Sequence, residues 1–249
     1  MLSRLSRLTH LTHRQVTHSA LSWHYVSSRR LSSCWNCGAS HSVEGDKKRV
    51  NLVLFCSKPA CGVIQEVPDV IDYYELLDIP EHDREHVSFG IDVNLLEKSF
   101  KNLQKRIHPD LYTNKSLMEQ ELSSQHSSLI NQAYNTLKNP VKRAAYILKY
   151  FYNIDALAET SGTYDDPAVN MEVFLLRETV DELNYKNTSP QNKKIIEEAL
   201  HEIKEKEEQT IAQFQTMCQE QDIHGMTKAA IMLKYISKAK ESMKEQMID

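Results

Sequence analysis

The chain has 249 residues, enough for one or two hydrophobic cores and a small additional module, and its 6 glycines and 7 prolines favour long helices over many short strands. Residues 1–33 hold 5 of the 30 basic residues and none of the 34 acidic ones, so the remainder carries 25 basic and 34 acidic residues. This acidic excess argues against a nucleic-acid partner, which would need clustered cations. No run of 18 apolar residues is present, so we expect no membrane-spanning helix and no membrane partner.

The first 33 residues have the composition of a targeting segment. They are rich in arginine and serine and lack acidic residues, and Leu2, Leu5 and Leu8 would lie on one side of a helix. This pattern is typical of a mitochondrial transit peptide, and a tail without a targeting role is the alternative. We therefore expect the protein in the mitochondrial matrix, with the cytoplasm as a second compartment.

Residues 34–66 form a predicted metal-binding module. Four cysteines occur there in two close pairs, each followed by a glycine that permits a sharp turn: Cys34 and Cys37, then Cys56 and Cys61. In a reducing compartment such pairs favour a metal over disulfides, and four thiolates suit a closed, structural zinc site in a small zinc-ribbon-like module. Iron takes the same ligands and is not excluded, and disulfides or free thiols are further alternatives. The apolar run 50–55 predicts a strand, and the solitary Cys218 is predicted to be a small core residue.

Residues 70–150 predict a group of helices. Capping residues indicate where three of them start, at Asp72, Asn94 and Ser116, and residues 141–151 predict a fourth. The second helix has an apolar stripe with helical spacing: Leu96, Phe100, Leu103 and Ile107.

The tripeptide His108-Pro109-Asp110 follows the second helix. Pro109 cannot continue a helix, so the chain turns there and projects His108 and Asp110 from the helix end. The outer side of this helix is basic: Lys98, Lys101, Lys105 and Arg106. An acid–base pair formed by the histidine and the aspartate is the alternative use, but no serine or cysteine stands in a recognisable nucleophile elbow, so we do not predict an enzyme.

Residues 165–249 predict three long helices with short connections, and therefore an antiparallel three-helix bundle after a linker at 153–166. The first helix has a core stripe with helical spacing: Val169, Val173, Leu176, Val180 and Leu183. Apolar and acidic residues also occur away from the core stripes: Met171, Phe174, Leu175, Glu178 and Glu182 on the first helix, and Ile231 and Tyr235 on the last. Exposed apolar residues rimmed by charge indicate a partner surface. Packing against the preceding helices, or in a wider bundle, is the alternative.

Residues 72–150 resemble a J domain, through Tyr73–Leu77, the His108-Pro109-Asp110 loop and Ile130–Leu137. In that family the loop and the basic second helix bind a DnaK-type chaperone and trigger its ATP hydrolysis. The resemblance therefore implies a chaperone-binding site made of two sets of residues: His108, Pro109 and Asp110 in the loop, and Lys101, Lys105 and Arg106 on the helix.

The order of cysteine pairs, J domain and acidic bundle resembles the HscB-type co-chaperones, called Jac proteins in fungi. In that family the bundle binds the iron–sulfur cluster scaffold protein, through apolar residues of its first helix and an aromatic residue of its last helix. The resemblance implies a mainly helical, non-enzymatic co-chaperone that delivers the scaffold protein to a mitochondrial DnaK-type chaperone and so promotes cluster assembly and transfer. The expected scaffold-binding residues are Phe174, Leu175, Leu176 and Tyr235 by resemblance, with Glu178, Glu182 and Ile231 added from helical geometry.

Leu176 also lies on the core stripe, so a role in the core is its alternative. Two other functions fit parts of the sequence. A general J protein for unfolded clients would need no surface for a folded partner. A metal-dependent enzyme or redox protein would use the four cysteines for chemistry.

Overall fold

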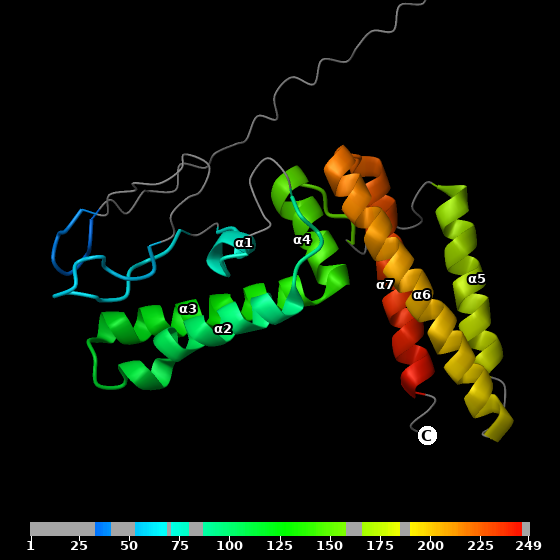
Figure 1. Cartoon of the computed structure of the whole chain (residues 1–249), viewed down its shortest axis with the longest axis horizontal. Helices are drawn as coiled ribbons and strands as arrows, with labels where there is room; N and C mark the ends of the chain where they lie inside the picture. Colours follow the sequence, from blue (N-terminus) through cyan, green and yellow to red (C-terminus); the bar gives the residue numbers. More distant parts are fainter. Residues whose placement is uncertain are drawn as a thin grey trace, which may run out of the picture.

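The computed structural model describes residues 33–40, 53–68, 71–79, 87–157, 166–184 and 190–245. These residues form α-helices and one 3-10 turn, in chain order α1 (Tyr73–Leu76), α2 (Val93–Ile107), η1 (Pro109–Tyr112), α3 (Leu117–Lys138), α4 (Pro140–Tyr152), α5 (Pro167–Asn184), α6 (Pro190–Glu220) and α7 (Ile223–Glu245). Two arms result, a hairpin of α2 and α3 and a bundle of α5, α6 and α7, which meet at α4 (Figure 1). The prediction of a mainly helical fold with a hairpin and a three-helix bundle is confirmed.

The start and the end of the hairpin helices follow from local capping. Asp92 begins α2, because its carboxylate accepts the backbone N–H of Asn94 at 2.8 Å. The predicted cap at Asn94 is therefore wrong, since that residue already lies in the first turn. Ser116 begins α3 in a capping box with Glu119, as predicted. The two helices are joined across the hairpin by stacked rings of Phe100 and Tyr134, with centroids 4.2 Å apart.

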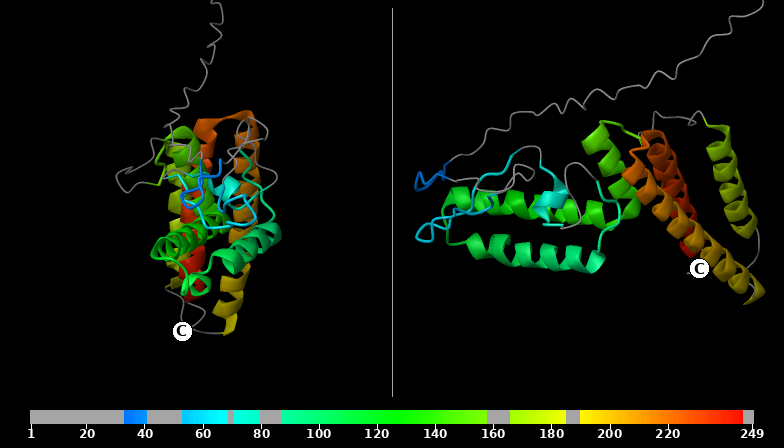
Figure 2. Two further views of the ribbon diagram at one scale, coloured as in Figure 1. Left: turned by 90° about the vertical axis from the view of Figure 1, so that its left-hand side faces the viewer. Right: turned by 45° about the horizontal axis from the view of Figure 1, so that its top comes forward.

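A continuous core joins α1 to α4 with the C-terminal end of α6 and the N-terminal half of α7. The rings of Phe89 and Phe214 lie 4.4 Å apart, and Phe214 is fully buried although it belongs to α6. Arg143 of α4 is also buried. Its guanidinium is compensated there, because it donates to the carbonyl of Leu137 at 2.7 Å and lies over the Phe89 ring. Cys218 lies in this core, so its prediction as a small core residue is confirmed. Figure 2 shows the resulting junction between the two arms from two other directions.

Helix α7 is buried on two faces, which corrects one sequence expectation. Residues such as Met226 and Leu233 pack into the core of α1 to α4, whereas Ile231, Met232 and Ile236 pack with α5 and α6. The expectation that Ile231 is exposed is therefore wrong. It assumed one core stripe per helix, but α4 and α5 both contact α7 and lie on opposite sides of it (Figure 1), so both sides of α7 are covered.

The cysteine module contains isolated β-bridges, between Ser33 and Ser40 and between Phe55 and Ile64, rather than a strand in its described part. The predicted strand over 50–55 is therefore wrong for residues 53–55, and residues 50–52 lie outside the described part. The predicted transit peptide lies outside it as well, apart from residue 33, as does most of the predicted linker. None of the helices in the described ranges is long and apolar enough to cross a membrane.

Candidate functional site

The four module cysteines come together at one point. Their sulfur atoms all lie within 4.8 Å of one another, with 3.8 Å between Cys34 and Cys61 and 3.7 Å between Cys37 and Cys56. Each pair is followed by a glycine whose backbone lies in the left-handed region, with φ +66° at Gly38 and +59° at Gly62. A residue with a side chain would be strained in this conformation, so glycine permits the turn. The sequence is thus folded into two knuckles that face each other.

The sulfur positions fit a tetrahedral metal site. A tetrahedron with metal–sulfur distances of about 2.3 Å has edges of about 3.8 Å, close to the observed sulfur separations. A disulfide would need sulfurs about 2 Å apart, so these cysteines are not paired as disulfides in this structure. The donor set is the same for zinc and for iron, so the geometry defines a tetrathiolate metal site without selecting the metal.

The thiols of this cluster differ in their tendency to ionise. Burial raises the pKa of Cys34, but hydrogen bonds from the backbone amides of Cys37 and Asn36 and from the thiols of Cys56 and Cys37 together outweigh it, so the pKa falls to about 6. Burial raises the pKa of Cys56 to about 12, and its hydrogen bonds with the other three cysteine sulfurs act in the same direction, with a backbone hydrogen bond at Lys58 opposing them. The side-chain amide of Gln65 also donates to the sulfur of Cys34 at 3.4 Å. Amides aimed at sulfur are the arrangement that stabilises metal-bound thiolates.

The His108 loop is exposed but held from inside. The side chains of His108 and Asp110 are 53% and 86% exposed, and the Nδ1 of His108 accepts the backbone N–H of Asp110 at 3.3 Å. Behind the loop, the hydroxyl of Tyr112 donates to the carbonyl of Arg106, and that of Ser123 donates to the carbonyl of Ile107. These two bonds satisfy the last carbonyls of α2, so the loop leaves the helix in a fixed direction.

The cations predicted next to the loop are exposed on α2, but they differ in their neighbours. Lys101 forms an ion pair with Glu97 at 2.6 Å. Arg106 lies over the ring of Phe55 in the cysteine module, with 4.2 Å between its Cζ and the ring centroid. No local sequence pattern indicates this contact, because the two residues are 51 positions apart in the chain.

The apolar and acidic residues of α5 that were predicted to form a partner surface are exposed. Its exposed fractions are 59% for Met171, 60% for Phe174 and 52% for Leu175, and Glu178 and Glu182 are also exposed. These three apolar side chains and two acids are called the α5 surface below.

Two further residues predicted for this surface are only partly available. Leu176 is half-buried against the bundle core, as its alternative assignment to the core stripe predicts. Tyr235 of α7 is also half-buried, and the guanidinium of Arg177 lies 5.0 Å from its ring centroid. Arg177 was not predicted, although its position one residue after Leu176 brings it to the seam between α5 and α7.

The comparisons with known proteins agree with this architecture. The family model described as the DnaJ domain matches residues 72–146, and the model described as the HSCB C-terminal oligomerisation domain matches residues 165–244. The chain is 27% identical over 215 residues to the human iron–sulfur cluster co-chaperone protein HscB, covering 86% of this chain and 82% of the human one. It is 31% identical over 169 residues to the Arabidopsis thaliana homologue of that protein, covering 68% of this chain and 59% of the relative.

Solved structures show the same likeness. The crystal structure of human co-chaperone protein HscB matches with a TM-score of 0.69 at 27% identity, covering 87% of this chain and 98% of that one. The chaperone HscB from Vibrio cholerae matches with a TM-score of 0.58 at 26% identity, covering 71% of this chain and 98% of the other. The bacterial match covers less of this chain than the human one.

The helical hairpin with its exposed His108-Pro109-Asp110 loop defines a J-domain protein. The C-terminal bundle and the two sets of comparisons narrow this class further. The chain belongs to the HscB family of J-domain co-chaperones of iron–sulfur cluster assembly, a family without enzymatic activity of its own.

Proposed function

We propose that this protein binds the iron–sulfur cluster scaffold protein on its bundle, delivers it to a mitochondrial DnaK-type chaperone and stimulates that chaperone's ATPase. The observation that carries the proposal is the separation of two exposed surfaces on two arms that share one core. The His108 loop lies at the free end of the hairpin, whereas the α5 surface lies on the other arm (Figure 1). A shared core fixes the two arms relative to each other, so one molecule can bind both partners at once.

The hairpin supplies the chaperone-binding site in this proposal. Its docking residues are the loop, His108, Pro109 and Asp110, and the cations of α2, Lys101, Lys105 and Arg106. Exposed cations steer a chaperone with an acidic docking surface and fix its register. The loop then contacts the chaperone with the direction set by the bonds to the last α2 carbonyls. Hydrolysis takes place on the chaperone, and this chain contributes no catalytic group.

The α5 surface supplies the scaffold-binding site. Phe174 and Leu175 are the central apolar contacts, Leu176 contributes its exposed part, and Glu178 and Glu182 form an acidic rim for a basic edge of the scaffold. Tyr235 is the aromatic contact from α7. Exposed apolar groups of this size are uncommon on one helix face unless a partner covers them.

The metal site has a structural role in this proposal. Cys34, Cys37, Cys56 and Cys61 would hold a zinc ion, which supplies a fixed crosslink between the two knuckles and no open position for chemistry. The acid-free and arginine-rich residues 1–33 support the mitochondrial matrix as the compartment. A reduced matrix also keeps the four thiols available for the metal.

The test is single-turnover ATP hydrolysis by a mitochondrial DnaK-type chaperone. Wild type should stimulate hydrolysis and His108→Gln should not, because the variant loses the imidazole of the loop. The matched control is His201→Gln on the exposed surface of α6, which should stimulate like wild type. A wild-type protein without any stimulation would refute the J-domain part of the proposal.

Binding of the scaffold protein is tested separately by calorimetric titration. Leu175→Ala should weaken binding about tenfold or more, since loss of a buried leucine contact at an interface removes about 1.5–3 kcal/mol. The control is Ile195→Ala, which shortens another exposed apolar residue on α6. If Leu175→Ala binds the scaffold as tightly as the control does, a general J protein for unfolded clients becomes the better description.

A further inference from the structure

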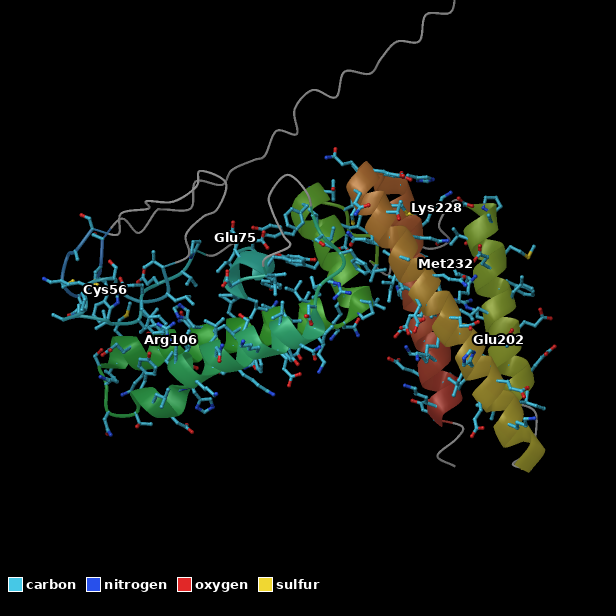
Figure 3. All side chains as sticks on the ribbon, viewed as in Figure 1. Cys56, Glu75, Arg106, Glu202, Lys228 and Met232 are labelled. Atoms are coloured by element: carbon cyan, nitrogen blue, oxygen red, sulfur yellow. The ribbon has the colours of Figure 1, made fainter. Side chains whose placement is uncertain are left out.

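An aromatic side chain of the cysteine module contacts a cation of the hairpin. The Cζ of Arg106 lies 4.2 Å from the centroid of the Phe55 ring, over its face. Phe55 directly precedes the metal ligand Cys56, and Arg106 comes two residues before His108. Figure 3 shows Arg106 on the hairpin, next to the loops that carry Cys56. This contact therefore connects the metal site with the end of α2 that carries the His108 loop.

Phe55 is held from its own side of the contact. It is paired with Ile64 in an antiparallel bridge, and the neighbouring backbone bonds run from Cys56 to Val63 at 2.8 Å and from Gln65 to Leu54 at 2.9 Å. The two chain segments of this bridge are joined by the knuckle that contains Cys56. Closure of the metal site thus restricts the backbone on which the ring is carried.

The module is also anchored in the hairpin core. Ile64 is fully buried in the core of α1 to α4, and its carbonyl accepts the indole N–H of Trp35 at 2.7 Å. Trp35 lies between the first two cysteines, so both knuckles contact the anchor residue. The module is therefore packed against the hairpin, which fixes its position relative to α2.

We propose that Phe55 is a positioning residue for chaperone binding, holding the Arg106 guanidinium beside the His108 loop, and that closure of the four-cysteine site keeps Phe55 in place. The proposal rests on the function proposed above, in which Arg106 is a docking cation. A free arginine side chain loses conformational entropy when it is fixed on a partner, and a contact that fixes it beforehand lowers this loss. A cation–π contact does so while the arginine keeps its charge.

The expected size of the effect follows from the strength of such contacts. A cation–π contact at a partly exposed site changes an equilibrium about two- to fivefold. Phe55→Leu keeps an apolar side chain but removes the ring, so it should raise the cochaperone concentration for half-maximal ATPase stimulation by about that factor. Phe55→Tyr keeps the ring face and should behave like wild type. The maximal rate should change in neither variant, because His108 is untouched.

Comparison in two backgrounds separates positioning from a general structural role. Phe55→Leu is tested alone and together with Arg106→Ala, with the metal content of each protein measured. Positioning predicts that Phe55→Leu has no further effect once Arg106 is alanine. An equal effect in both backgrounds overturns the proposal, because the ring would then act without the arginine.

A second readout needs neither the chaperone nor a variant. In the NMR spectrum of the metal-loaded full chain, the ring current of Phe55 should shift the side-chain Nε–H proton of Arg106 upfield, and removal of the metal should abolish this shift. A resonance that keeps the same position with and without metal overturns the link to the four-cysteine site.

Failure of the proposed function gives a different pattern from failure of this inference. If wild type does not stimulate the chaperone, both proposals fall. If wild type stimulates but Arg106→Ala stimulates with the same affinity, Arg106 is not a docking residue, and the positioning role of Phe55 is refuted while the co-chaperone function stands. If Arg106→Ala weakens docking while Phe55→Leu and Phe55→Tyr both leave it unchanged, only the positioning role of Phe55 is refuted.

Discussion

His126 of α3 makes the stability of this protein depend on pH. Its side chain is 2% exposed, and both ring nitrogens lack a hydrogen-bond partner within the described part of the chain. Burial disfavours the charged imidazolium and lowers the pKa of His126 from 6.5 to about 4. The folded protein therefore holds this histidine neutral at pH 7.

The sign of the effect follows from proton binding. Between pH 6.5 and pH 4 the unfolded chain binds a proton at His126 that the folded chain does not bind, so the free energy of unfolding decreases as the pH falls. At about 1.4 kcal/mol per pH unit, the decrease between pH 7.5 and pH 5 is roughly 2 kcal/mol. His126→Leu removes the titrating group and fills similar space, so this part of the pH dependence should disappear.

The assay is urea unfolding of wild type and His126→Leu at several pH values from 7.5 to 5, with the metal site loaded. Lower pH is avoided because acid competes with metal for the thiolates of both proteins. The free-energy difference between the two proteins should shift by roughly 2 kcal/mol in favour of the variant over this range. His201→Leu on the surface of α6 is the matched control. A difference between wild type and His126→Leu that is constant with pH would refute the burial argument.

Three further predictions concern other parts of the fold. Ile231→Ala should lower the free energy of unfolding by about 2–4 kcal/mol in urea titrations, because Ile231 is buried between α7 and its bundle neighbours. An unchanged free energy of unfolding would contradict the burial of this side chain. Asn139→Ala should lower the free energy of unfolding by about 1 kcal/mol in the same measurement, since the Asn139 side chain accepts the backbone N–H of Lys142 at the start of α4. Asn139→Ser should retain most of this stability, because serine also caps helices. Chelation of the metal should increase amide hydrogen exchange in 33–40 and 53–68 but leave α6 and α7 protected; a uniform loss of protection would contradict a local structural role.

The sequence by itself determined the local features of this protein. Helix starts at Ser116 and Pro167 depend on capping within one turn, and the His108 loop depends on a proline that ends a helix. The four cysteines and their glycines are likewise a matter of short spacing, and they meet as expected. Such features are readable because the interacting groups lie a few residues apart.

The tertiary structure decided which helix faces are covered and which distant groups meet. Periodicity shows that Ile231 lies away from one stripe of α7, but only the packing of α4 and α5 on opposite sides shows that it is buried. In the same way, the basic character of α2 predicts Arg106 as an exposed cation, whereas its position over Phe55 depends on how the cysteine module docks. The burial of a residue depends on all the elements that surround it, and the sequence of one helix does not show which elements pack against it.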